Sequence, residues 1–387
     1  MLAAAVLERI AVVPADRFAA GPPAGRYVDR GGSAERLEQP RFAAQPVQGV
    51  SAIQPGPQRD TWWALSDNGF GSKWNSLDYR ACLYLFEFRT SATPGALNPV
   101  LRRRLELRDP HRRFPYPLVL HDSDPRRPFT GGDIDPESLV VMPDGSFWIG
   151  EEHGPWLLHF SAGGRLLAPP IELELPDVGA VRAAVHPRVL TGRARANLRA
   201  SKGVEGLAAQ RRAGQLLLYA LLEGVLDGEA DPRDLRLLEF DPRRRAWTGR
   251  HWRYRLADPT HAIGELASYR GAEFLVIERD DRHGAAAQFK KIFTVALTPD
   301  GRGERLPARE LVDLLEIADP ARLASATGRL RFSYWTTEAV YALSAERLVV
   351  VNDNNYPASG GRETDDGRSG ALGDPTEWLW LRLKSAR

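Results

Sequence analysis

A pair of short apolar strands, joined by a turn and flanked by acids, recurs along this chain and limits the folds open to it. In the clearest copy, within residues 131–155, the apolar runs Leu139–Met142 and Phe147–Ile149 enclose the turn Pro143-Asp144-Gly145. This pattern predicts a tight β-hairpin. Acids flank the hairpin on both sides in the sequence: Asp133, Asp135 and Glu137 precede the first strand or lie at its start, and Glu151 and Glu152 follow the second.

Four further segments match this hairpin when its first strand and its closing acid are aligned. The five copies start at Ser51, Glu137, Glu205, Glu265 and Glu338. They close on Asp67, Glu151, Glu223, Glu278 and Asp353. The starts lie 60 to 86 residues apart, which fits four-stranded blades better than a short solenoid repeat.

The repeat predicts an all-β protein, a β-propeller that forms a single domain over residues 1–387. Five blades are visible in the repeat. We expect a sixth, built from strands left over near the N-terminus and around Trp247 to Tyr254, and hence a six-bladed propeller. Helical periodicity is scarce, with residues 309–317 as the best candidate for a helix.

The open end of an antiparallel hairpin brings the start of one strand beside the end of the next, so the paired acids of each copy should meet. If each hairpin supplies inner strands, the carboxylates converge on one face around the channel. Such a ring repels itself unless a proton or cation intervenes, which favours a metal site. Asp133, Asp135 and Glu137 alternate, as oxygen ligands on one side of a strand would, although a loop-capping Asx cluster is the alternative.

The ordered set of segments resembles the phytase-like proteins described as having esterase-like activity of phytase, a β-propeller family. The resemblance covers about residues 45–356 and includes Gly49-Val50-Ser51-Ala52, Asp135-Pro136-Glu137-Ser138, Gly150-Glu151-Glu152, Lys202-Gly203-Val204-Glu205-Gly206-Leu207, Leu275-Val276-Ile277-Glu278-Arg279-Asp280 and Val351-Asn352-Asp353-Asn354-Asn355. It implies calcium-dependent hydrolysis of phosphate esters by an enzyme, with a small phosphate ester as substrate. The chain departs from the expected pattern at Ser51, which has no carboxylate, and around Glu338.

The acids expected to bind calcium are Asp67, Asp133, Asp135, Glu137, Glu151, Glu152, Glu205, Glu223, Glu278, Glu338 and Asp353. Three other residues are candidates for catalysis. Lys202 either binds substrate phosphate or neutralises the acids. Arg279 assists the substrate if it, rather than its neighbour Glu278, faces the channel. His153 is a general acid, a metal ligand or an exposed loop residue.

Other function classes find less support. The net charge is only +2, and the arginine runs carry no interleaved aromatic residues, which argues against nucleic-acid binding. No segment is long and apolar enough for a membrane span, and residues 1–13 do not form a typical signal peptide, although the family resemblance favours an exported protein. We expect a monomer. Motifs of serine hydrolases, nucleotide enzymes and zinc proteases are missing. The rivals are a propeller lactonase or esterase and a non-enzymatic binding propeller braced by calcium.

Overall fold

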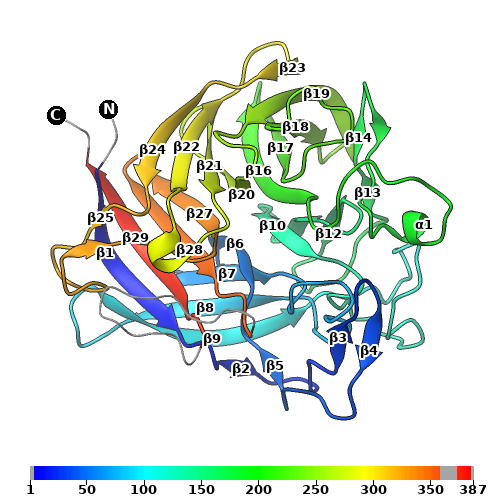
Figure 1. The fold of residues 1–387 in the computed structure, drawn as a ribbon, viewed down its shortest axis with the longest axis horizontal. Helices are drawn as coiled ribbons and strands as arrows, with labels where there is room; N and C mark the ends of the chain where they lie inside the picture. The colour runs from blue at the N-terminus through cyan, green and yellow to red at the C-terminus, as the bar shows by residue number, and fades with distance from the viewer. Residues whose placement is uncertain (1–3, 358–372, 385–387) are drawn as a thin grey trace.

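Five four-stranded antiparallel sheets form the body of the protein (Figure 1). The structure is a computed structural model that describes residues 4–357 and 373–384. Blade 1 consists of β6 (Val50–Pro55), β7 (Thr61–Ser66), β8 (Cys82–Thr90) and β9 (Ala96–Glu106). Blade 2 consists of β10 (Pro136–Val141), β11 (Phe147–Glu151), β12 (Trp156–Phe160) and β13 (Ile171–Glu172).

The other three blades follow in chain order. Blade 3 consists of β16 (Val204–Arg212), β17 (Gln215–Leu222), β18 (Asp234–Asp241) and β19 (Ala246–Arg255), extended by β23 (Arg302–Arg305). Blade 4 consists of β20 (Ala262–Ser268), β21 (Glu273–Arg279), β22 (Lys290–Ala296) and β24 (Ala308–Asp313). Blade 5 consists of β27 (Thr336–Ser344), β28 (Arg347–Asp353), β29 (Thr376–Lys384) and β1 (Ala4–Val13).

Short elements connect the blades. The paired ones are β2 (Phe18–Ala19) with β5 (Gln45–Pro46), β3 (Tyr27–Asp29) with β4 (Ala34–Arg36), β14 (Glu174–Leu175) with β15 (Gly179–Ala180), and β25 (Ile317–Ala318) with β26 (Arg329–Leu330). The helical elements described are the single turns α1 (Pro187–Leu190) and η1 (Gly284–Ala286). The helix expected within residues 309–317 is instead strand β24 and the turn after it.

The innermost strands close a ring in which β6 packs on β10, β10 on β16, β16 on β20, β20 on β27, and β27 on β6. The all-β propeller is therefore confirmed. Within the described residues the ring has five blades, so the expected sixth is wrong. The N-terminal strand completes blade 5, and residues 247–254 belong to β19, the fourth strand of blade 3.

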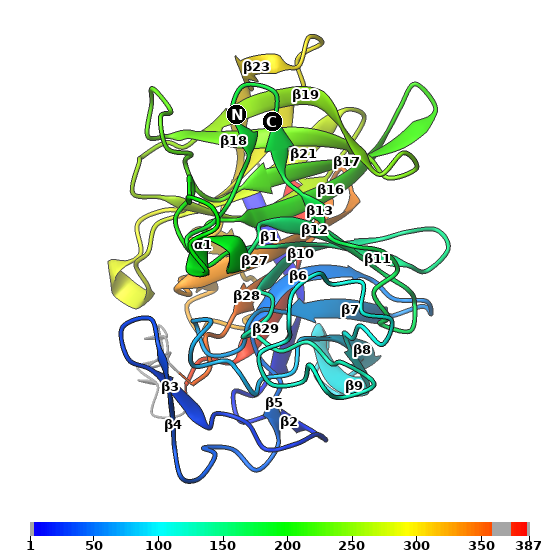
Figure 2. The same ribbon diagram turned by 90° about the vertical axis from the view of Figure 1, so that its right-hand side faces the viewer.

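The two ends of the chain close the ring together. Strand β1 pairs antiparallel with β29 over the register from Val13↔Thr376 to Ala4↔Lys384. It also pairs in parallel with β9 at Ile10↔Ala96, which joins blades 5 and 1 in one sheet. Both views place β1 beside β29 (Figures 1 and 2). A single blade thus depends on segments from both ends of the chain.

Sheet faces in a propeller are covered by the neighbouring blades, so their strands need apolar side chains on both sides. In β28 the run Leu348–Val351 is fully buried. Its side chains divide between two core clusters, because Leu348 and Val350 lie in one and Val349 and Val351 in the other. Aromatic side chains fill the space between blades 5 and 1, where Trp378 of β29 packs 4.8 Å from Phe88 of β8 between ring centroids.

We expect Trp378→Ala to lower the free energy of unfolding by about 3–5 kcal/mol, the usual cost of truncating a buried aromatic side chain. Trp378 is fully buried where blades 5 and 1 meet, so the loss reports on ring closure. Trp335→Ala is the control, since Trp335 is 40% exposed and its removal should change stability by less than about 0.5 kcal/mol. Equal losses in urea denaturation of the two variants would contradict this account of the closure.

Candidate metal centre and active site

The innermost strand of every blade carries a β-bulge at the same place. The pairing between first and second strand shifts by one residue, and the residue skipped is Ser51, Glu137, Glu205, Gly264 or Glu338 in blades 1 to 5. A bulge re-aims the side chain of the extra residue, and bulges are common beside active sites. We call these five positions the bulge ring. Three of them hold a glutamate.

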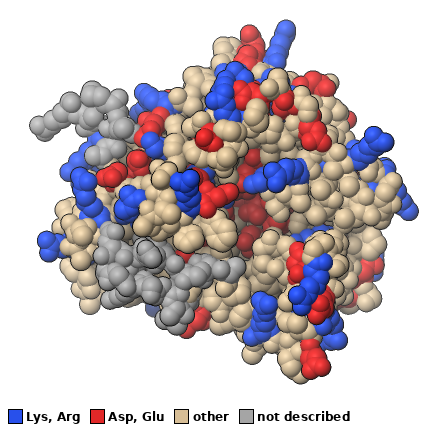
Figure 3. Space-filling view, in the orientation of Figure 1, with Lys and Arg blue, Asp and Glu red and all other residues tan. Residues whose placement is uncertain are grey.

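A second set of equivalent positions lies at the ends of the second strands. The last residue before each bulge pairs with a residue of the second strand. The next residue along that second strand occupies the position meant here. In blades 1 to 5 these residues are Asp67, Glu152, Glu223, Arg279 and Asp353. We call these positions the exit ring. Four blades supply an acid here and blade 4 supplies an arginine. In the space-filling view, acidic side chains accordingly gather in a central hollow of this face (Figure 3).

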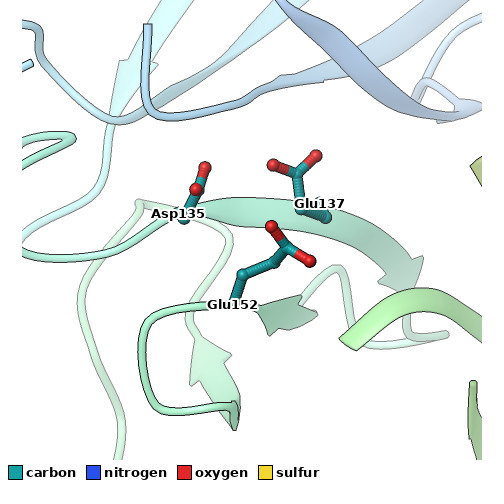
Figure 4. A group of neighbouring side chains, drawn as sticks. All are labelled: Asp135, Glu137 and Glu152. Carbon is teal, nitrogen blue, oxygen red and sulfur yellow. The ribbon is translucent and has the colours of Figure 1, made fainter. Parts of the chain in front are cut away.

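Two groups of three carboxylates come together in these rings. Asp135, Glu137 and Glu152 form the first group, in which one oxygen of each residue lies within 4.8 Å of the others. Their side chains point toward one another from β10, the residue before it and the loop after β11 (Figure 4). Glu152, Glu205 and Glu223 form the second group by the same measure. Glu152 belongs to both, so the buried groups could hold metal ions side by side.

Backbone and amide donors fix two members of this cluster, Asp135 and Glu152. Asp135 accepts hydrogen bonds from Asn68 N at 3.0 Å and Asn68 Nδ2 at 2.8 Å. Glu152 accepts one from Gly203 N at 2.6 Å. Gly203 allows this approach, because a Cβ there would lie 2.4 Å from Glu152 Cα. Glu205, by contrast, accepts no hydrogen bond from any described residue, although only 5% of it is exposed. A bound cation would compensate for the missing hydrogen bonds of this carboxylate.

Burial and crowding raise the pKa values of these acids. Burial is the larger cause for Glu137 and Glu205, and repulsion from neighbouring carboxylates raises their pKa further. The same causes, partly opposed by Arg279, bring the pKa of Glu338 to about 8, and burial brings that of Asp353 to about 6. A bound cation would relieve this repulsion. A set of carboxylate oxygens with no nitrogen or sulfur fits a hard cation such as Ca²⁺.

Two cations border the acids. Lys202 Nζ lies 2.6 Å from Glu223 Oε2, and the lysine side chain keeps 35% of its surface exposed. Arg279 occupies the exit ring in place of an acid, with Nη2 3.3 Å from Glu338 Oε1 and Nη1 2.8 Å from Asp281 Oδ1. Of the neighbouring residues Glu278 and Arg279, it is therefore the arginine that faces the channel.

Three of the acids predicted as ligands do not join the cluster. Asp133 accepts hydrogen bonds from Val119 N and Thr130 N, so the loop-capping alternative describes it. Glu151 accepts hydrogen bonds from the backbone N–H groups of the loop that follows it. Glu278 points away from the channel and accepts hydrogen bonds from Tyr254 Oη and Ala257 N, at 2.6 and 2.8 Å. Successive side chains of a strand point to opposite faces, which explains the positions of Glu151 and Glu278. The residues that follow them, Glu152 and Arg279, are the ones that face the channel.

His153 is buried, which rules out one of its three alternatives, the exposed loop residue. Its Nε2 lies 3.7 Å from Asp135 Oδ2, behind the first group of acids. Burial, followed by the charge of Lys73, holds the pKa of His153 well below its usual range. The ring is therefore neutral at physiological pH, and an acid role for it is not supported by this position.

Sequence reasoning missed Lys73 and Asn68. Lys73 is almost fully buried, and its Nζ contacts the carbonyl oxygen of Gly132, below Asp133 and Asp135. Its one signal in the sequence is rarity, because the chain has five lysines against 47 arginines. Asn68 follows Asp67 in a loop, and nothing in its spacing indicated that it would bind Asp135 in the next blade.

The fold and the site define a five-bladed β-propeller whose channel opens, on one face, into a buried cluster of carboxylates able to hold metal ions. The family model "Phytase-like: Esterase-like activity of phytase" matches residues 45–356, and the chain belongs to this family. The match covers every blade strand from β6 to β28. It leaves out β1 and β29, the two strands that close the ring.

A curated relative and several solved structures are also similar. An "Uncharacterized secreted protein" of Arthroderma benhamiae is 27% identical over 194 residues, 40% of this chain and 36% of that protein. The match thus spans about a third of the relative's length. The GH93 alpha-L-arabinofuranosidase of Fusarium graminearum is 8% identical, with 96% of this chain and 97% of that one covered and a TM-score of 0.42. A glycosyl hydrolase of Bacteroides ovatus is 9% identical over 86% and 84% of the chains, with a TM-score of 0.38.

Among the described residues, no helix has the length and apolar character needed to cross a membrane.

Stability of the metal-free protein should fall as pH rises. The folded-state pKa values of Asp353 (about 6) and Glu338 (about 8) lie above those of an unfolded chain. Their contribution is therefore fully present below about pH 4 and is lost as pH rises through these folded values. In chelator we expect the melting temperature to decrease between pH 5 and pH 8, with at least about 1.4 kcal/mol of stability lost, equal to one pKa unit.

Added calcium should reverse this trend, because a ligand bound only to the folded state stabilises it, and binding requires ionised carboxylates. Differential scanning calorimetry at several pH values, with and without calcium, measures both effects. Melting curves in chelator that do not depend on pH, and do not respond to calcium, would contradict a metal-binding cluster.

Glu205→Gln should weaken calcium binding by about tenfold or more, which is the effect typical even for groups that only support the ligands of a metal. Glu278→Gln is the matched control, since Glu278 is equally buried but faces Tyr254 and His261. It should lower stability and leave calcium affinity unchanged. Isothermal titration calorimetry compares the two variants, and an equal loss of affinity in both would show that the assignment of Glu278 outside the channel is wrong.

Proposed function

We propose that this protein is a calcium-dependent hydrolase of phosphate esters. The observation that carries the proposal is that two groups of three acids share Glu152 and lie directly beside Lys202. Asp135, Glu137 and Glu152 would hold one ion, and Glu152, Glu205 and Glu223 a second. Bound calcium would supply charge neutralisation for the phosphate oxygens and a water with a lowered pKa. Membership of the phytase-like family supports this choice of chemistry.

Lys202 is the group suited to bind the substrate. Its ammonium is tied to Glu223 on one side, yet about a third of the side chain is exposed, so it can donate to a phosphate oxygen as well. Burial lowers the pKa of Lys202, but the carboxylate of Glu223 outweighs it and raises the pKa above its usual value. The side chain therefore stays charged while substrate is bound.

Arg279 has a different role in this proposal. Its guanidinium is 7% exposed and held between Glu338 and Asp281, so it has little freedom to reach out. It places a fixed positive charge in the wall of the channel mouth, beside the position where a phosphate would lie. The reaction itself breaks the bond between phosphorus and the ester oxygen, with water adding to phosphorus and the leaving alcohol taking up a proton.

Secretion is part of the same proposal. The similar protein of Arthroderma benhamiae is described as secreted, and extracellular calcium concentrations suit weak calcium sites. A monomer, as expected from the sequence, agrees with a propeller that closes its own ring through β1 and β29.

Lys202→Ala should lower kcat/KM for phosphate esters by about tenfold or more, since it removes a charge-assisted hydrogen bond to the phosphate. Calcium affinity should stay equal or rise slightly, because a cation beside the acids repels the metal. The control is Lys291→Ala, whose Nζ pairs with Glu310 at 2.8 Å on strands away from the channel. Unchanged phosphatase kinetics in Lys202→Ala would contradict the substrate-binding role.

A panel of phosphate monoesters, phosphodiesters, lactones and carboxylic esters, assayed with calcium and with chelator, tests the function as a whole. We expect turnover of a phosphate ester that chelator abolishes. Turnover of lactones alone would favour a propeller lactonase. Calcium binding without any turnover would favour the binding propeller braced by calcium.

A further inference from the structure

A second charged site lies on the outer side of blade 1, away from the channel mouth. A cavity of about 630 Å³ opens there between β9 and the N-terminal segment that contains β2. Both ribbon views place β2 next to β9 (Figures 1 and 2). Five arginines and one acid are among its lining residues: Arg17, Arg102, Arg103, Arg104, Arg108 and Glu106. We call this cavity the arginine pocket.

Some buried nitrogen atoms of the arginine side chains in the arginine pocket have no hydrogen-bond partner among the described residues. The Arg104 side chain is 9% exposed and donates from Nη1 to Glu106 Oε1 at 3.0 Å. Its Nε and Nη2 are buried and make no hydrogen bond, and neither does the buried Nε of Arg108. A buried donor left without a partner costs about 1–3 kcal/mol, and more when it is charged. These donors are closed off from solvent, and the Arg104 guanidinium lies beside Cys82 and Tyr84, so the two arginines place positive charge in the wall of the cavity.

The other arginines add charge that nearby acids do not balance. Arg102 pairs with Glu87, which also pairs with Arg89. Arg17 and Arg103 are exposed, and their side chains form no ion pair or hydrogen bond with the described residues. The main chain of Arg17 is nevertheless fixed, because Val47 N donates to its carbonyl oxygen at 2.8 Å. Among the described residues, acid partners are found for Arg102 and Arg104 but not for the other three arginines.

We propose that the arginine pocket is a binding site for a small tetrahedral oxyanion carrying two negative charges, such as phosphate, sulfate or the phosphoryl or sulfate group of a small molecule. The planar fork of donors in a guanidinium matches such oxygens, and charge-assisted hydrogen bonds of this kind are strong. The charge of Arg104 and Arg108 in the cavity wall would attract an oxyanion. Arg17 and Arg103 at the rim would attract it and complete its coordination.

This site differs in kind from the channel mouth. The mouth gathers acids from inner strands, whereas the arginine pocket gathers cations along β9, the outermost strand of its blade. The proposal requires neither calcium nor turnover. The two sites can therefore fail independently, and binding to the arginine pocket should persist in chelator.

Isothermal titration calorimetry of the full chain with sulfate, in chelator, tests the proposal. We expect binding to the unmodified protein, and a Kd raised by about tenfold or more when Arg17→Ala and Arg103→Ala are combined, a change of about 1.4 kcal/mol. Both side chains are exposed, so the double variant should fold. Arg243→Ala combined with Arg244→Ala is the matched control, because it removes two exposed arginines from the turn between β18 and β19. It should bind sulfate like the unmodified protein.

Further titrations identify the oxyanion. Inorganic phosphate should bind with a similar Kd and compete with sulfate, while succinate, a flexible dianion whose two carboxylates are planar, should bind more weakly. Absence of sulfate and phosphate binding, or equal weakening in the two double variants, would overturn the proposal. So would binding confined to a long polyanion such as duplex DNA, since that would indicate a charged surface and not a cavity site.

Discussion

Repulsion among carboxylates confined to the mouth of the channel is the interaction on which the rest of this structure depends. The bulge ring and the exit ring bring seven acids together, and blade 2 adds Asp135 just before its first strand. Such a group destabilises the folded state at neutral pH unless protons or cations compensate. The chain supplies Lys202 and Arg279 at the rim and Lys73 behind Asp135. Three cations against eight acids leave a strong negative potential, which a bound metal ion would reduce.

The five blades do not contribute equally to the acidic cluster, and blade 4 differs from the others for a steric reason. Blade 4 has Gly264 in the bulge ring and Arg279 in the exit ring, where the other blades place an acid in at least one of the two. A side chain at Gly264 has no room, because its Cβ would lie 2.2 Å from the carbonyl oxygen of Thr337 in blade 5. The close approach of blades 4 and 5 at this point thus excludes a glutamate. The arginine that takes the neighbouring place binds Glu338 of blade 5 and lowers the charge on that side.

Much of this could be predicted from the repeat alone, and its errors have physical causes. The apolar hairpins between acids identified the five inner strand pairs, because a blade covered on both faces needs continuous apolar runs. The alignment placed the acids by residue type and could not fix the register to one residue, so it has Glu265 where the bulge residue is Gly264. Glu151 and Glu278 were likewise assigned to the channel. Each lies one residue before a channel residue, Glu152 or Arg279, and alternation along the strand turns its side chain to the other face. The sixth blade was expected because strand β1 and residues 247–254 had no partner in the sequence, and closure of blade 5 by both chain ends is a long-range contact that no local pattern records.

The asymmetry between blades also gives the site a direction. Both groups of three acids lie on blades 2 and 3, and they share Glu152. Lys202 lies just before the first strand of blade 3, and Arg279 is the last residue of the second strand of blade 4. The acids that could hold metal ions and the cations proposed to bind substrate therefore adjoin at blade 3, where Lys202 donates a hydrogen bond to Glu223 of the second group. A phosphate ester that contacts both the bound metal ions and the side chains of Lys202 and Arg279 would lie over this blade rather than centrally on the channel axis. Blades 1 and 5, with Asp67, Asp353 and Glu338, would then face the departing alcohol, and their charge disfavours an anionic leaving group. Substrates whose leaving group carries few negative charges should consequently be preferred.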